Sequence, residues 1–256
     1  MCILERADLE YFERGKIENP RFWTNLNGEP NFVGKKILDI GCGHGSLCVY
    51  LAFKGARQVI GIDINQRLID FAKENILLNY PQFKKSIKFI CCEINSIQES
   101  DFDFIVSKDT FEHIMNLDTV LDQMYNKLKA QGKAYIGLAP LYNSPFGDHG
   151  RTKALLPWGH LIFPESFLLR RLNKHLNTYI KSIYELGLNM YSLAEYKNLF
   201  FKRIKKWNIL LFRINATRSL KSKLFSFFRF VPFLEEYFSH NLFCILEKRE
   251  DLDKTK

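Results

Sequence analysis

The stretch that decides the fold is Ile37-Leu38-Asp39-Ile40-Gly41-Cys42-Gly43-His44-Gly45. An apolar run ends in an acidic residue and is followed by glycine at every second position. The apolar run is typical of a buried strand, and the glycines predict a tight turn into a helix because they accept unusual backbone angles. A helix that begins here offers free backbone N–H groups to a ligand. Ser46 stands where a dinucleotide-binding fingerprint needs its third Gly or Ala, so the turn does not match an NAD site.

Strand-like stretches alternate with helical patterns on both sides of this turn. This order predicts repeated βα units, and we expect an α/β fold with a doubly wound, seven-stranded, mostly parallel sheet. An antiparallel C-terminal strand pair and helical insertions complete the expected fold. Its ligand crevice lies at the carboxyl ends of the strands. The expected strands are 36–40, 58–62, 87–91, 102–106, 132–138, 204–214 and 241–248.

Apolar residues at three- and four-residue spacing predict the helices. They are expected at 66–79, 117–128, about 164–177 and 192–201, with a basic and aromatic helical insert around 224–238. We expect one domain over 1–256, made of an N-terminal helical segment (1–34), a core (35–138) and a C-terminal part (139–256). The last part contains a long loop, 139–164, which is rich in Pro, Gly, His and aromatic residues.

Composition limits the class of protein. With 256 residues, 46% of them hydrophobic, the chain can build a substantial core, which argues against a disordered or fibrous protein. The six cysteines form no CxxC pair, which favours a reducing compartment and gives no sign of structural zinc. The start of the sequence does not have the pattern of a signal peptide, and no apolar run reaches about 18 residues. We therefore expect a cytoplasmic protein.

The net charge of +9 is unevenly distributed. From Lys197 to Arg229 the chain carries ten Lys and Arg residues and no Asp or Glu. Such a segment predicts a positive surface that attracts phosphate-bearing substrates, nucleic acid or an anionic membrane. A solvated basic face without a partner is the alternative.

Acidic residues also follow the next expected strands. Asp63 ends the second strand, 22 positions after Gly41, where Rossmann-type sites keep an acid for ribose hydroxyls. Glu93 follows the third strand, and the fourth runs into Ser107-Lys108-Asp109-Thr110-Phe111-Glu112-His113-Ile114.

With the glycine turn, these segments resemble the class I S-adenosylmethionine-dependent methyltransferases of the small-molecule type. The resemblance covers 19–138 well and the remainder loosely. It implies S-adenosylmethionine as the cofactor, with Asp39 at the methionine amino group, Asp63 at the ribose and Ile64 against the adenine. Glu93 departs from the family's usual Asp at the adenine amino group. The implied cofactor-binding residues are Asp39, Gly41, Cys42, Gly43, Gly45, Asp63, Ile64, Glu93, Ile94 and Ser107.

Methyl transfer requires positioning and, for a protonated acceptor, removal of a proton. The candidate catalytic residues are Asp109 and His113 after the fourth strand, and His149 and His160 in the long loop. His113 has an alternative role in packing beneath the cofactor. We expect no metal, because His149 and His160 have no third ligand at a recognisable spacing.

We expect the acceptor to be a small molecule, a saccharide or a lipid-linked compound, methylated on oxygen. Base-modifying enzymes carry an Asn- or Asp-Pro-Pro-Tyr type of motif where this chain has Ser107 to Thr110, and the Pro-Cys nucleophile of pyrimidine C5 enzymes is also missing. An RNA methyltransferase that uses the basic segment stays open as an alternative. So does a catalytically silent S-adenosylmethionine-binding protein. The sequence does not indicate an oligomeric state.

Overall fold

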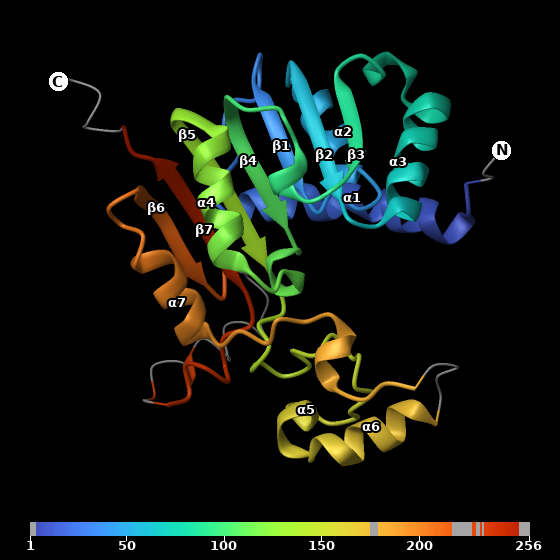
Figure 1. The fold of residues 1–256 in the computed structure, drawn as a ribbon, viewed down its shortest axis with the longest axis vertical. Helices are drawn as coiled ribbons and strands as arrows, with labels where there is room; N and C mark the ends of the chain where they lie inside the picture. Colours follow the sequence, from blue (N-terminus) through green and yellow to red (C-terminus); the bar gives the residue numbers. More distant parts are fainter. Residues whose placement is uncertain (1–3, 175–178, 217–226, 229–230, 232, 251–256) are drawn as a thin grey trace.

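The computed structural model describes residues 4–174, 179–216, 227–228, 231 and 233–250. Its centre is a seven-stranded sheet of order β3-β2-β1-β4-β5-β7-β6 (Figure 1). The first five strands along the chain pair in parallel, whereas β7 is antiparallel to both β5 and β6. The expected doubly wound α/β fold is confirmed. The strands are β1 Lys36–Ile40, β2 Gln58–Asp63, β3 Ile87–Cys91, β4 Phe102–Lys108, β5 Leu128–Leu138, β6 Trp207–Ile214 and β7 Leu242–Lys248.

Helices cover both faces of the sheet. Side chains alternate between the faces, so Ile37 joins the core beneath α1, α2 and α3, while Leu38 joins the core beneath α4 and α7. The α-helices are α1 Arg6–Asn25, α2 Ser46–Phe53, α3 Gln66–Asn79, α4 Leu117–Lys127, α5 Gly159–Ile162, α6 Glu165–Asn173 and α7 Leu193–Phe201. Short 3₁₀ turns are η1 Pro81–Phe83, η2 Ile94–Ser96, η3 Phe111–His113 and η4 Ile183–Leu186.

Helix α3 shows why the sequence patterns were informative. The Asn65 side chain caps the helix by accepting the backbone N–H groups of Arg67 and Leu68, at 3.1 and 3.4 Å. The stripe that includes Ile69 and Ile76 is buried against the sheet. The Asn65 cap and the apolar stripe both indicate the same helix, and α3 has the bounds predicted from the sequence.

Strands β2 and β3 extend the sheet to one side of β1 and strands β4 and β5 to the other, so the strand order reverses between β1 and β4, which are parallel neighbours. The turn after β1 and the segment after β4 therefore meet at one edge. Residues 139–174 and 179–190, including α5 and α6, lie beyond the carboxyl ends of β4 and β5 (Figure 1). This places the long loop over the crevice that the fold predicts.

Several predicted boundaries differ from the structure, and three of them have a clear structural reason. Strand β5 begins at Leu128 rather than Gly132, and the helix before it ends at Lys127, because Leu128 is already extended and pairs with Phe102. The strand expected from Ile204 begins at Trp207, since the preceding residues form the turn that closes α7.

Part of the C-terminal third lies outside the described residues. This applies to 175–178 of the helix expected at 164–177, which is observed as α6, and to most of the insert expected at 224–238. Residues 233–238 of that insert form turns. Among the helices that are described, none is long and apolar enough to cross a membrane.

Candidate functional site

The glycine turn after β1 needs glycine for two different reasons. Gly41, Gly43 and Gly45 all have positive φ, +73°, +50° and +81°. A Cβ at Gly41 would overlap the Thr110 side chain, and one at Gly45 would lie 2.6 Å from Cζ of Phe89. At Gly43 a Cβ would meet no atom within 4 Å. The outer glycines thus allow close packing, while Gly43 borders open space.

Asp63 connects the end of β2 to this turn. Its Oδ2 accepts the backbone N–H of Gly43 at 2.9 Å, and its Oδ1 accepts that of Asn65 at 2.9 Å. Carboxylate oxygens have lone pairs beyond these two bonds. Asp63 therefore orders the turn and can still accept hydrogen bonds from hydroxyl groups of a ligand.

Asp39 lies at the end of β1 and is only 2% exposed. The Cys48 thiol, a weak donor, lies 3.2 Å from its Oδ2. Burial raises the pKa of Asp39 to about 7, against the lowering effects of Cys48 and Lys108. A cationic group brought next to this carboxylate would stabilise its charged form.

Ile64 and Glu93 follow β2 and β3 and point to solvent at the same edge. Ile64 is 77% exposed, which is costly for a large apolar side chain unless something covers it. Glu93 is exposed as well. By contrast, three other predicted cofactor residues, Cys42, Ile94 and Ser107, are buried.

Helix α1 crosses the glycine turn, a contact that the sequence analysis missed. His44 Nε2 lies 2.8 Å from Oδ1 of Asp8, and Arg67 donates to Oδ2 of Asp8 at 2.6 Å. Farther along α1, Lys108 at the end of β4 pairs with Glu18 at 3.4 Å. Helix α1 therefore joins the turn after β1 to the end of β4.

The segment after β4 contains a buried acid that the sequence analysis did not select. Glu112 is 5% exposed, and among the described residues neither carboxylate oxygen has a hydrogen-bond partner. Burial, reinforced by the charge of Asp109, raises the pKa of Glu112 to about 8. The predicted Asp109 is exposed and accepts a hydrogen bond from Lys108 at 2.9 Å.

His113 and His149 come together above this acid. Their ring centroids are 5.5 Å apart, although 36 positions separate them in the sequence. Nδ1 of His113 lies 2.8 Å from the Gly187 carbonyl oxygen. Burial lowers the pKa of His113, and burial together with His113 and Arg151 lowers that of His149 to about 4. Both rings are therefore neutral near pH 7.

His160 lies inside the long loop. It is 4% exposed, its Nε2 is 2.7 Å from the Tyr142 carbonyl oxygen and its Nδ1 is 3.9 Å from Oδ1 of Asp148. The residues that join His149 in a cluster of potential metal ligands are Glu112 and His113. In the sequence His149 is grouped with His160 instead, because spacing along the chain does not show which loops meet.

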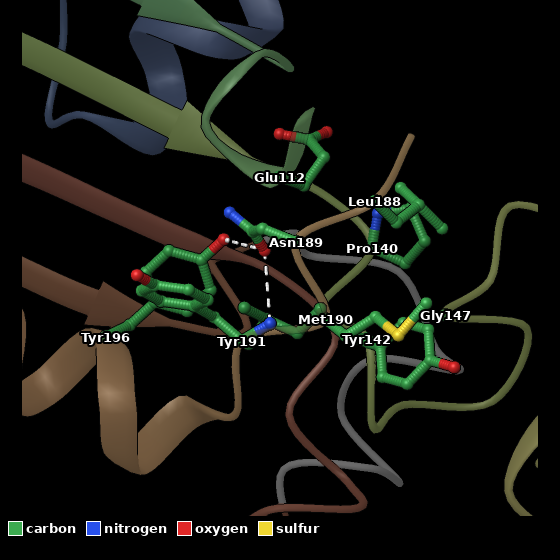
Figure 2. A pocket seen from close by; sticks show the side chains of 10 residues that line it. Glu112, Pro140, Tyr142, Gly147, Leu188, Asn189, Met190, Tyr191 and Tyr196 are labelled. Carbon is green, nitrogen blue, oxygen red and sulfur yellow. Dashed lines mark hydrogen bonds between the residues drawn. The ribbon is translucent and has the colours of Figure 1, made fainter. Parts of the chain in front are cut away.

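A cavity of about 10 Å³, the space of about one water molecule, adjoins Glu112 (Figure 2). Oδ1 of Asn189 accepts hydrogen bonds from the Tyr191 backbone N–H at 3.1 Å and the Tyr196 hydroxyl at 3.4 Å. The other end of the Asn189 side chain donates to the backbone carbonyls of Phe111 and Ile114. One asparagine thus fixes both the cavity wall and the η3 turn. The cavity is lined by Glu112, Pro140, Leu141, Tyr142, Gly147, Leu188, Asn189, Met190, Tyr191 and Tyr196.

The geometry around the glycine turn agrees with comparison to known proteins. Residues 31–144 match the family model described as a methyltransferase domain. This segment is a methyltransferase domain. The family resemblance predicted from the sequence is confirmed, and the match contains β1 to β5 together with Asp39, Asp63 and Glu112.

The similarity to curated relatives covers part of each chain. An uncharacterised Haemophilus influenzae protein is 37% identical over 120 residues, 45% of each chain. The ubiquinone biosynthesis O-methyltransferase of Neisseria meningitidis serogroup C is 26% identical over 168 residues, 64% of each chain. The matched segments thus span less than two thirds of these relatives' own lengths.

The fold of the methyltransferase domain and its C-terminal extension also occurs in solved structures. Geranyl diphosphate C-methyltransferase from Streptomyces coelicolor superimposes with a TM-score of 0.59 at 13% identity. The superposition covers 96% of this chain and 88% of that one. At this identity the similarity shows a shared fold.

Proposed function

We propose that this chain is an S-adenosylmethionine-dependent methyltransferase that methylates a hydroxyl oxygen of a small-molecule, saccharide or lipid-linked acceptor. The observation that carries the proposal is the open space at Gly43, bordered by a buried carboxylate, Asp39, and a hydrogen-bonding carboxylate, Asp63. The match of residues 31–144 to a methyltransferase domain supports it.

The residues at this edge fit the parts of the cofactor. Asp39 offers a buried carboxylate to an α-amino group, and Asp63 keeps lone pairs free for ribose hydroxyls. Ile64 offers an exposed apolar surface for a flat ring, with Glu93 at the next strand end. When bound, the cofactor supplies a methyl group on a sulfonium for in-line displacement by the acceptor. The chain positions that acceptor and excludes water from it.

The region around the cavity beside Glu112 is our candidate acceptor site, and the long loop must move outward to admit an acceptor, because the cavity holds about one water molecule. It lies where the long loop covers the ends of β4 and β5, next to the predicted catalytic residues His113 and His149. We propose that these two histidines face the acceptor, with Asp109 at the rim. We propose that His160 stabilises the fold of the long loop, because its Nε2 contacts the Tyr142 carbonyl oxygen.

Charge pairing supports a small acceptor over RNA. Within the segment 197–229, four of the basic side chains are paired with acids in the structure. The pairs are Lys197 with Glu235, Lys202 and Arg203 with Asp118, and Lys206 with Asp122. Paired cations attract phosphate less than free ones do. Arg218, Lys221, Lys223 and Arg229 lie outside the described residues.

The proposal is tested by incubating the chain with methyl-labelled S-adenosylmethionine and cell extract, then separating RNA, lipid, glycan and small-molecule fractions. We expect label in one of the last three fractions, and its loss with Asp63→Ala. Label confined to RNA would overturn the acceptor class. An unlabelled extract, with cofactor binding intact, would favour the silent binding protein.

A further inference from the structure

We propose that Glu112, His113 and His149 form a binding site for a divalent first-row transition-metal ion at the edge of the acceptor cavity. The geometry of these residues supports the metal site by itself. We propose that the ion holds the acceptor through a hydroxyl oxygen, and this role rests on the proposed methyltransferase function.

The three side chains converge from two segments. One potential ligand atom from each lies within 4.8 Å of the others. Ligand bonds of about 2.0–2.2 Å place two donors about 3.4 Å apart at a tetrahedral ion. The observed limit is wider, so the side chains must rotate inward to surround an ion. His149, which comes from the exposed side of the loop, has the freedom to do so.

The burial of the Glu112 carboxylate favours a bound cation. A carboxylate that is buried without a hydrogen bond is strongly unfavourable unless it is protonated or paired. Glu112 is 5% exposed, and both of its oxygens are without partners in the described part of the chain. It also lines the cavity (Figure 2). A metal ion would supply the missing partner.

His113 already has the arrangement of a metal ligand. The contact of 2.8 Å between its Nδ1 and the Gly187 carbonyl oxygen requires that Nδ1 carry the proton. Nε2 therefore has a free lone pair, and the ring is held in place by the carbonyl, as is usual for ligating histidines. The backbone on both sides of His113 is fixed by the Asn189 side chain.

The positively charged side chain of Arg151 lies close to the proposed site, and it would repel a metal ion if it faced the ligand atoms. Its guanidinium donates to the Gly187 carbonyl at 3.3 Å and to the Leu186 carbonyl, and lies 3.5 Å from Nδ1 of His113. These contacts place it on the Nδ1 side of the ring. The free Nε2 is the opposite ring nitrogen.

The donor set indicates which ions fit. Two imidazoles and one carboxylate suit Zn²⁺, Fe²⁺ and their first-row neighbours, whereas Mg²⁺ and Ca²⁺ prefer oxygen ligands. Three protein ligands leave a position open for water or an acceptor hydroxyl. A hydroxyl bound there releases its proton to solvent more readily, which prepares the oxygen for methylation.

The test uses the full chain after treatment with a chelator, titrated with Co²⁺ and followed by visible absorption, and with Zn²⁺ in competition. We expect saturation at one equivalent, with d–d bands and without the thiolate charge-transfer band that a cysteine site would give. His149→Gln, His113→Gln and Glu112→Gln should each weaken binding at least about tenfold. His240→Gln is the matched control, because His240 is exposed and outside the cluster, and it should bind as the wild type does.

Binding of S-adenosylhomocysteine is measured on the same samples. His149→Gln should retain it, which shows that the variant is folded and separates this proposal from the proposed function. Wild-type protein that takes up no stoichiometric metal would overturn the site, as would metal binding that none of the three substitutions weakens. If metal binds but S-adenosylhomocysteine does not, the site stands and the methyltransferase role fails.

Discussion

Asp63, at the end of β2, accepts the backbone N–H of Gly43 at 2.9 Å and so links the second strand to the turn that follows the first. Asp63→Ala should loosen this turn, because a charge-assisted hydrogen bond of about 1.5–3 kcal/mol is lost. We expect faster amide hydrogen exchange at Gly43, measured by NMR. Asp63→Asn is the control, since its side-chain oxygen can still accept the bond and should preserve more of the protection. Equal protection in wild type and Asp63→Ala would contradict this role.

Ile64 is exposed, so its truncation should affect binding far more than folding. Ile64→Ala should change the free energy of unfolding by no more than about 0.5 kcal/mol. It should weaken S-adenosylhomocysteine binding several-fold, because it removes the apolar surface expected against the adenine. Ile204→Ala, another exposed isoleucine away from the crevice, is the control and should change neither quantity. If both substitutions leave affinity unchanged, Ile64 does not contact the ligand.

The first half of the fold could be predicted because local and tertiary signals agree there. In α3, the Asn65 cap and the apolar stripe give the same bounds as the structure. The start of strand β5 was predicted too late because Lys129 and Gln131 are polar and exposed, yet Leu128 already pairs with Phe102, and after a register shift the ladder resumes at Lys133. A ladder hydrogen bond leaves no mark in the hydropathy pattern.

The candidate functional site could be predicted only where residues that are close in the sequence are also close in the structure. Asp39 and the glycines occupy one turn, whereas the cluster of Glu112, His113 and His149 requires that the long loop fold back over β4. The hydrogen bonds from Asn189 to the η3 turn and the contact between Asp8 and His44 also join residues that are far apart in the sequence. The unpartnered state of Glu112 is a consequence of burial, which no local pattern around it reveals.

Asp39 should make the stability of the ligand-free protein depend on pH. Its pKa is about 7 when folded against an ordinary value of 3.8, so the folded state keeps the proton to higher pH. The contribution of Asp39 to stability should therefore fall as pH rises from about 4 to about 7 and level off above, with an upper limit on the order of 4 kcal/mol.

Asp39→Asn should remove this contribution. Urea unfolding at pH 5 and pH 8 should show a smaller loss of stability at the higher pH for the variant than for wild type. The same variant should bind S-adenosylhomocysteine more weakly, because the carboxylate for the amino group is gone. An unaltered pH dependence would mean that Asp39 is not the titrating group.

The pairing of Asp8 with His44 and Arg67 should stabilise the contact of α1 with the glycine turn. Asp8→Ala removes the acceptor that faces the buried His44 ring and should cost about 1–3 kcal/mol in urea unfolding. A double-mutant cycle with His44→Ala should give a coupling energy of at least about 0.5 kcal/mol. Glu10→Ala breaks the exposed Arg6–Glu10 pair on the same helix and should cost less than about 0.5 kcal/mol. Equal effects of the two acidic substitutions would argue against a specific role for Asp8.

The central claim is that the edge formed by Asp39, Gly43 and Asp63 binds S-adenosylmethionine. Isothermal titration calorimetry of the full chain tests it most directly, with S-adenosylmethionine and S-adenosylhomocysteine as ligands. The account predicts saturable binding of both at one site per chain, weakened at least about tenfold by Asp63→Ala. Folded wild-type protein that binds neither ligand would contradict it.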